Sequence, residues 1–218
     1  MPSLTLAGQS ASAHAWFRSA PGLAVIDSQA GEVARALGAR PGQHWLWLGP
    51  ADGGDTPNDG RGLHLVRSDG GWRGDIACGL PLPLPNEAFA TVVLQHVVPA
   101  GGASDALLAE AARILLPGGR LWMFALNPLS PYRWRWRGTG LSGSEPLVWR
   151  RRLRQHGFAP DPVSQGIGPT WQVASSAGLQ HGPGMRAAYL LCADKRQWPL
   201  TPQRARGELR LPRQAPAA

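Results

Sequence analysis

Residues 91–126 constrain the fold most strongly, because an apolar run, an amphipathic helix pattern and a second apolar run follow one another there. Residues 91–98 (TVVLQHVV) are apolar enough for a strand buried on both faces. Ser104 or Asp105 can cap a helix whose apolar residues recur at helical spacing up to a Pro-Gly-Gly stop. Residues 120–126 (RLWMFAL) then predict another buried strand. A strand, a helix and a strand in this order predict a βαβ unit with parallel, adjacent strands.

Other segments extend this pattern into a single α/β domain. Further strands are expected over 44–48, 63–66, 158–163 and 186–193, and further helices over about 28–38 and 144–156. The weakly patterned segment 1–26 is expected to lie over the surface, anchored by Trp16 and Phe17. We therefore expect a mainly parallel α/β sheet in one domain over 1–197. The basic, Pro/Arg-rich segment 198–218 has few large apolar residues and is expected to be a disordered tail.

Charge is divided unevenly along the chain. Residues 1–110 carry 6 Arg and 10 acidic residues, whereas residues 111–218 carry 15 Arg, 1 Lys and 4 acidic residues. The formal charges are therefore −4 and +12, within a total of +8. This asymmetry suggests an anionic substrate or partner for the C-terminal half. Alternatively, the arginines pair with acidic residues of the N-terminal half, and no external partner is needed.

Several classes of protein are disfavoured by composition. Cys78 and Cys192 are far apart and form neither a disulfide framework nor a metal-binding pattern, so both are expected to be buried thiols. No apolar run approaches the roughly 18 residues of a membrane span, and the N-terminus does not resemble a secretory signal. We therefore expect a cytoplasmic protein without a membrane span or a metal.

Three motifs occur in an order and spacing typical of one family. Residues 82–96 read LPLPNEAFATVVLQH, residues 116–121 read LPGGRL, and residues 127–130 read NPLS. Together they resemble class I S-adenosylmethionine (SAM)-dependent methyltransferases, in particular the small bacterial methyltransferase type 11 group. The resemblance covers 82–130 well and the rest of the C-terminal half more loosely. It implies a Rossmann-like, mainly parallel sheet with helices on both faces. It also implies that SAM and a small-molecule or macromolecular acceptor bind over the carboxyl ends of the strands, and that a methyl group is transferred between them.

The resemblance also assigns candidate site residues. Gly49, Gln95, His96 and Asn127 would lie on one rim of the sheet, and the cofactor-binding set would be Gly49, Ala51, Gly53, Asp69 and Gln95. His96 would lie near the methionine end of SAM or act on the substrate, and Asn127 would face the substrate pocket. These two residues are the catalytic candidates. A histidine at the end of a buried strand is, however, more often a structural residue than a base.

The cofactor-binding region departs from the family pattern. The family has an acidic residue and a Gly-x-Gly-x-Gly loop after its first strand, but here Trp47 replaces the acid and Ala51 replaces the middle glycine. Only 33 residues, including 9 Gly and 3 Pro, separate Leu48 from Leu82. Two average helices and two average strands would use roughly 32 of them. At least one helix should therefore be missing between the first and fourth strands, and the SAM site should be reduced, remodelled or lost.

Residues 132–137 (YRWRWR) alternate aromatic rings with arginines. In an extended conformation, the rings would lie on one side and Arg133, Arg135 and Arg137 on the other. These arginines are candidates for binding an anionic substrate or single-stranded nucleic acid. Alternatively, the aromatic residues plug the sheet edge, and the arginines are solvated or stack on them. The alternative function is a non-catalytic methyltransferase-like protein that binds nucleic acid or an acidic protein through its C-terminal half.

Overall fold

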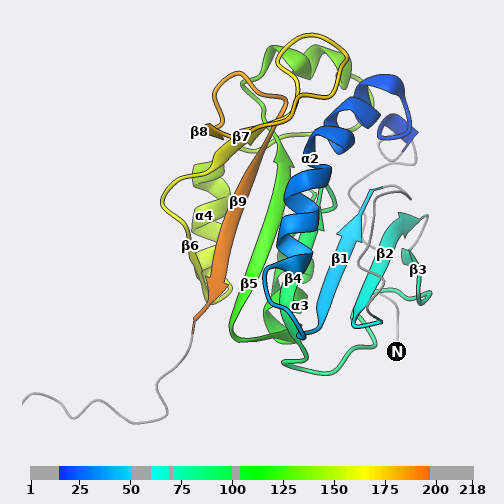
Figure 1. Ribbon diagram of the computed structural model, residues 1–218, viewed down its shortest axis with the longest axis vertical. Coiled ribbons are helices and arrows are strands. Elements are labelled where there is room, and N and C mark those ends of the chain that lie inside the picture. The colour runs from blue at the N-terminus through cyan, green and yellow to red at the C-terminus, as the bar shows by residue number, and fades with distance from the viewer. Residues whose placement is uncertain (1–14, 51–59, 69–70, 100–103, 197–218) are drawn as a thin grey trace, which may run out of the picture.

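The computed structural model describes residues 15–50, 60–68, 71–99 and 104–196. Figure 1 shows a twisted sheet with α2 on one face and with α3 and α4 on the other. The helices are α2 (Ala20–Gly38), α3 (Ser104–Ile114), the 3₁₀ helix η1 (Pro131–Arg135) and α4 (Pro146–Gln155). The strands are β1 (Trp45–Gly49), β2 (Gly62–Ser68), β3 (Gly71–Gly74), β4 (Phe89–Gln95), β5 (Leu115–Leu126), β6 (Phe158–Pro160), β7 (Gln165–Ile167), β8 (Gln180–His181) and β9 (Ala188–Lys195).

The sheet has the order β3-β2-β1-β4-β5-β9-β7-β8, and β6 also pairs with β9. Strands β2, β1, β4 and β5 are mutually parallel, whereas β3 and β9 run antiparallel to β2 and β5. Helix α3 connects the parallel neighbours β4 and β5, which confirms the βαβ unit expected from 91–126. The expected Rossmann-like fold is therefore correct.

Each face of the sheet has its own hydrophobic core. In β1, Trp45 and Trp47 belong to the core under α2, whereas Leu46 and Leu48 belong to the core under α3 and α4. Since both faces are covered, all five residues of β1 and all seven of β4 are buried. This double burial explains why these strands have continuous rather than alternating apolar sequences.

Helix α2 begins earlier than the sequence suggested. We expected it to start near 28, but it starts at Ala20, and Pro21 lies in its first turn. The Pro-Gly pair at 21–22 resembles a turn, yet proline is compatible with the first turn of a helix. Gly22 packs against the preceding chain, where an added Cβ would lie 2.2 Å from the Trp16 carbonyl oxygen. Trp16 and Phe17 are buried beside this helix, but residues 20–26 of the expected surface segment are helical, and its residues 1–14 lie outside the described residues.

The region between β1 and β4 is shortened, as expected. Strands β2 and β3 form a hairpin across residues 69–70, where a doubly wound fold would place a crossover helix. Within 60–68 and 71–88 the structure contains no helix. The expected loss of the helix after β1 falls on the connection 50–61, most of which lies outside the described residues.

Smaller differences occur toward the C-terminus. Strand β6 ends at Pro160 instead of continuing to 163, and β9 runs two residues beyond its expected end. The expected tail over 198–218 lies outside the described residues. No helix in the described part of the chain is long and apolar enough to cross a membrane. The same residues contain no group of three or more His, Cys, Asp or Glu placed to hold a metal. The cytoplasmic location stays a prediction.

Candidate functional site

The candidate site lies at the carboxyl edge of the parallel strands, at the top of the sheet in Figure 1. Strands β1, β4 and β5 are adjacent and parallel, so Gly49, Gln95, His96 and Asn127 come to the same edge, as the sequence predicted. Ala51, Gly53 and Asp69 lie outside the described residues. Their roles in cofactor binding stay predictions.

A buried chain of hydrogen bonds connects β1, β4 and α2 below this edge. The Trp47 indole Nε1 donates to Gln95 Oε1 at 3.1 Å, and Gln95 Nε2 donates to Gln29 Oε1 at 2.9 Å. Gln29 Nε2 lies 2.8 Å from His96 Nε2. All four side chains are at least nine-tenths buried. The network therefore fixes the His96 imidazole against both α2 and β1.

The direction of this network sets which groups Gln29 presents to His96. An indole N–H can only donate, so Gln95 presents its oxygen to Trp47 and its amide N–H to Gln29 Oε1. His96 Nε2 lies 2.8 Å from Gln29 Nε2 and 3.1 Å from Gln29 Oε1. His96 Nε2 can therefore accept from the Gln29 amide or donate to its oxygen, and in either tautomer Gln29 holds the imidazole in place.

His96 is held in an unusual local conformation. Its φ angle is +54°, in the left-handed region that histidine adopts only occasionally. Its ring stacks on Phe17 with centroids 5.0 Å apart, and its backbone N–H donates to the Phe124 carbonyl. Burial lowers the pKa of His96 to about 3, so the imidazole is neutral near pH 7.

His96 also lines a small cavity. Its Nδ1 is buried and has no hydrogen-bond partner among the described residues. The cavity has a volume of about 20 Å³, enough for one water molecule. The other lining residues come from the chain before α2, from β5, from α4 and from loops, namely Phe17, Val98, Phe124, Ala125, Leu126, Leu141, Ser142, Gly143, Ser144 and Trp149. A buried ring nitrogen without a protein partner can pair with a water molecule or with a polar group of a bound molecule.

Asn127 is engaged in backbone contacts. Its Nδ2 donates to the carbonyls of Gly184 (3.0 Å) and Arg186 (2.9 Å) and lies 3.5 Å from that of Pro183. Its Oδ1 accepts from the Leu129 N–H at 3.1 Å. The amide thus anchors the 183–186 segment to the end of β5. A direct catalytic role for Asn127 stays a prediction.

The Tyr-Arg-Trp string is not extended, contrary to the conformation considered from its alternation. Residues Pro131–Arg135 form η1, since the Ser130 side chain caps it and Pro131 fits its first turn. Tyr132 and Trp136 are buried in the core under α2, whereas Trp134 is 56% exposed. The aromatic residues therefore do not form a continuous platform, which agrees with their alternative interpretation as a structural plug.

The arginines of this string differ in their surroundings. Arg137 and Arg133 lie over the exposed Trp134 ring, at 4.9 and 5.5 Å from its centroid. Arg135 instead lies over Tyr132 and donates to the Trp171 carbonyl at 3.1 Å. The sequence grouped the three arginines, but the structure brings only Arg133 and Arg137 together at a pocket.

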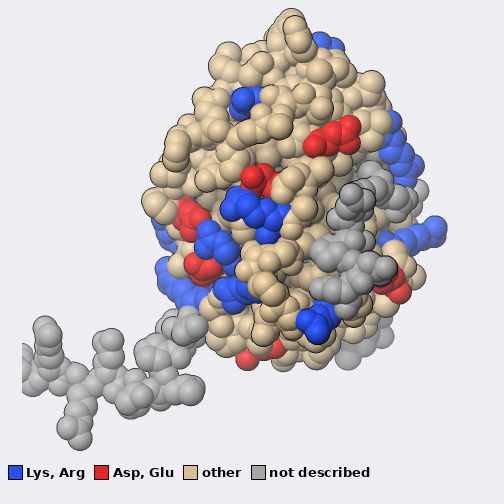
Figure 2. All heavy atoms as spheres, in the orientation of Figure 1, with Lys and Arg blue, Asp and Glu red and all other residues tan. Residues whose placement is uncertain are grey.

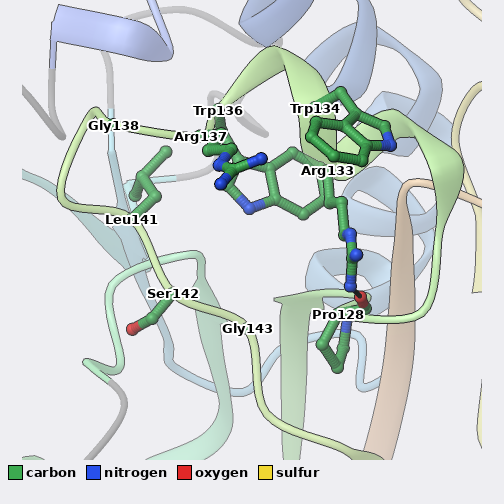
Figure 3. Close-up of a pocket in the computed structure, with 9 residues that line it drawn as sticks. All are labelled: Pro128, Arg133, Trp134, Trp136, Arg137, Gly138, Leu141, Ser142 and Gly143. Atoms are coloured by element: carbon green, nitrogen blue, oxygen red, sulfur yellow. Dashed lines mark hydrogen bonds between the residues drawn. The ribbon is translucent and has the colours of Figure 1, made fainter.

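This pocket is open to solvent and has a volume of about 410 Å³ (Figure 3). Its walls come from η1 and the chain on either side of it, namely Pro128, Arg133, Trp134, Trp136, Arg137, Gly138, Leu141, Ser142 and Gly143. Leu141, Ser142 and Gly143 line the small His96 cavity as well. The two hollows are therefore neighbours across segment 141–143, whose role the sequence did not reveal.

Comparison with known proteins identifies the fold. No family model matches the chain, and no curated protein matches it significantly. A SAM-dependent methyltransferase from Thermotoga maritima is 15% identical, with 84% of this chain and 94% of that chain covered and a TM-score of 0.51. A SAM-dependent methyltransferase from Archaeoglobus fulgidus is 12% identical, with coverages of 82% and 96% and a TM-score of 0.52.

A third similar structure comes from a Haloferax volcanii complex of the Trm112 methyltransferase activator and a methyltransferase. It is 15% identical, with 84% of this chain and 97% of that chain covered and a TM-score of 0.52. The strand order of the sheet, in which β9 is antiparallel to β5, agrees with these similarities. The chain has the fold of the class I SAM-dependent methyltransferases.

Proposed function

We propose that this protein transfers a methyl group from SAM to an acceptor bound over the carboxyl ends of β4 and β5. The observation that carries the proposal is the imidazole of His96, whose buried Nδ1 has no partner among the described residues and whose residue lines a cavity at the edge where open α/β sheets bind their ligands. The class I fold supports the choice of cofactor. Gly49, Ala51, Gly53, Asp69 and Gln95 are the proposed cofactor-side residues, and His96 and Asn127 the proposed catalytic-side residues.

The residues present can be compared with the chemical groups of SAM. Its amino acid part carries a carboxylate, which His96 can contact through a water molecule in the cavity of about 20 Å³. Strands β1, β2 and β4 contain no acidic residue, and Trp47 fills the position of the usual acid. Asp69 and the acidic residues of 51–59 are the proposed carboxylates for the ribose and the ammonium group. We therefore propose a SAM site with a redistributed set of polar groups.

The proposed reaction requires little acid–base catalysis by the protein. SAM supplies a methyl group already activated by a positively charged sulfur, so catalysis depends mainly on alignment of the reacting atoms. His96 suits this requirement, because its lowered pKa makes it a poor base and its contacts with Gln29 fix the position of its ring. Phe17, Phe124 and Trp149 line the cavity beside the imidazole with apolar rings.

Cofactor binding can be tested without knowing the acceptor. A ligand present at 100 times its Kd should stabilise the fold by about 2.7 kcal/mol, and this rise is readily measured as a higher Tm. We expect SAM and S-adenosylhomocysteine to raise the Tm in this way. His96→Asn, which tolerates the left-handed backbone, should weaken binding about tenfold if His96 holds the cofactor carboxylate. His181→Asn in the exposed β8 is the matched control. No Tm shift at millimolar concentrations of either compound would overturn the proposal.

A non-catalytic role remains the second candidate, because an indole occupies the position of the usual cofactor-binding acid. In that case the fold would bind an anionic partner through its C-terminal half. Absence of SAM binding, together with salt-sensitive retention on RNA or on an acidic protein, would favour this function. Saturable SAM binding would favour the enzyme.

A further inference from the structure

We propose that the open pocket beside η1 binds a small organic anion with a flat apolar body, and that this molecule is the methyl acceptor. Arg133 and Arg137 would bind its carboxylate or phosphate. The rings of Trp134 and Trp136 and the side chain of Leu141 would contact its apolar body. The acceptor role rests on the proposed function, but the binding itself does not require SAM.

Charge at the pocket is the first support. Some basic residues of the described chain form ion pairs, such as Arg120 with Asp161 and Asp194, and Lys195 with Glu87. Among the described residues, Arg133 and Arg137 have no carboxylate partner. Both residues line the pocket, where Arg133 Nη1 also donates to the Pro128 carbonyl at 3.5 Å (Figure 3). An anion in the pocket would give the two guanidinium groups a negatively charged partner, and guanidinium groups bind carboxylate and phosphate with two parallel hydrogen bonds.

The shape and lining of the pocket favour a flat apolar body. Its volume of about 410 Å³ lies within the usual range for small-molecule sites, roughly 300–1,000 Å³. Trp136 is only 4% exposed, whereas Trp134 is 56% exposed, and both guanidinium groups lie over the Trp134 ring. Indole rings that face a pocket bind planar groups by stacking or by edge contacts. The combination is typical of sites for aromatic or unsaturated acids.

The pocket is held in place by contacts from several elements. The Tyr132 hydroxyl donates to the Pro21 carbonyl at 3.0 Å, and the Trp16 indole donates to the Arg135 carbonyl at 2.8 Å. Gly143 approaches the end of β5 so closely that an added Cβ would lie 2.8 Å from the Leu126 carbonyl oxygen. The walls are thus fixed to α2 and β5 before any ligand binds, which lowers the entropic cost of binding.

The position of the pocket connects it with the proposed reaction. Segment 141–143 lines both the pocket and the His96 cavity, and Pro128 lies just beyond the carboxyl end of β5. An acceptor whose anionic end is held by Arg133 and Arg137 would therefore extend toward the edge where His96 lies. The nucleophilic atom of such an acceptor is expected at the end remote from its carboxylate or phosphate.

Nucleic acid fits the same surface less well. Only one ring of the string is exposed, whereas single-stranded nucleic acids stack successive bases on several rings. Arg150 and Arg152 of α4 lie on the other face of the sheet and are bonded to the Asp161 carbonyl and the Ser104 hydroxyl. On the face drawn in Figure 2, basic and acidic side chains of the described residues are interspersed and form no continuous basic track.

The proposal can be tested with 2-naphthoate as a flat anionic probe and 2-naphthamide as its neutral counterpart. Binding to the full chain, without SAM, is followed by NMR of ¹⁵N-labelled tryptophan indoles. We expect saturable shifts of the Trp134 and Trp136 signals, and binding of the neutral probe at least tenfold weaker. The double variant Arg133→Ala/Arg137→Ala should weaken naphthoate binding at least tenfold.

Two control variants distinguish binding in the pocket from nonspecific attraction by positive charge. The double variant Arg151→Ala/Arg154→Ala removes two exposed arginines from α4, and it should change the Kd less than twofold. Arg135→Ala, within the same string but outside the pocket lining, should also have a small effect. Absence of saturable shifts at millimolar probe would overturn the proposal, as would equal binding of the neutral probe. Tighter binding of oligouridylate with the same shifts would instead assign the surface to nucleic acid. Because SAM is absent, none of these outcomes depends on cofactor binding.

Discussion

The two halves of the sheet differ in how their strands are connected. On the proposed cofactor side, β2 pairs with the antiparallel β3, the next strand along the chain, and 71–88 contain no helix. On the proposed acceptor side, α3 connects β4 to β5, and the 127–145 segment with η1 lies at the carboxyl edge (Figure 1). Strands β2, β1, β4 and β5 are nevertheless parallel neighbours. This difference teaches that a crossover helix can be absent where strands remain paired.

The strongest test of this comparison removes one large buried side chain from each half. Trp72 lies in the β2–β3 hairpin and Trp149 lies in α4, and both are almost completely buried. We expect Trp72→Ala and Trp149→Ala each to lower the free energy of unfolding by about 3–5 kcal/mol, because each leaves a cavity in the same core. Urea unfolding measures both values. Trp134→Ala, at an exposed site, is the control, with an expected change below about 1 kcal/mol. A small effect at Trp72 alone would show that the shortened half contributes little to the fold.

A second test addresses the buried hydrogen-bond network of Trp47, Gln95, Gln29 and His96, which connects β1 and β4 to α2. Gln29→Leu should lower the free energy of unfolding by about 2–4 kcal/mol, because Gln95 and His96 then lose buried hydrogen-bond partners. Thermal and urea unfolding check the value. Gln155→Leu, at an exposed position in α4, should have little effect. Equal effects of the two variants would mean that the network is not a major source of stability.

The pH dependence of the free energy of unfolding tests the lowered pKa of His96. Its pKa is about 3 in the folded state and about 6.5 when unfolded, so the unfolded state binds a proton first as the pH falls. Stability from the neutral imidazole is complete above pH 6.5 and is lost toward pH 3. Between pH 7 and pH 5 we expect a loss of about 2 kcal/mol, which His96→Asn removes. Imidazole ¹⁵N shifts should show a neutral ring at both pH values. A doubly protonated imidazole in the folded protein at pH 5 would contradict this description.

The smallest expected effect concerns the pocket arginines. Arg133→Ala and Arg137→Ala should each change the free energy of unfolding by less than about 0.5 kcal/mol, since both residues are exposed. Arg120→Ala should cost about 1 kcal/mol, since Arg120 pairs with two aspartates. Urea unfolding of the three variants gives the order of their free energies of unfolding. If Arg133 or Arg137 proved more destabilising than Arg120, its role would be structural.

The sequence predicted the acceptor side better than the details of the site. Buried parallel strands have continuous apolar runs, and the β4–α3–β5 unit was therefore recognisable. The conformation of 132–137 was not, because alternation favours a strand whereas Ser130 and Pro131 locally favour a 3₁₀ helix. The role of Gln29 left no signal in the sequence. A single glutamine on a helix becomes meaningful only when tertiary packing places it beside Gln95 and His96.

The division into a cofactor side and an acceptor side is tested most directly by titrating the ¹⁵N-indole-labelled protein with two ligands. We expect S-adenosylhomocysteine to shift the Trp47 signal, because Trp47 lies two residues before the carboxyl end of β1. We expect 2-naphthoate to shift Trp134 and Trp136, and the two ligands to bind together. The division would be contradicted if S-adenosylhomocysteine shifted no indole at millimolar concentration, or if it competed with 2-naphthoate for the same signals.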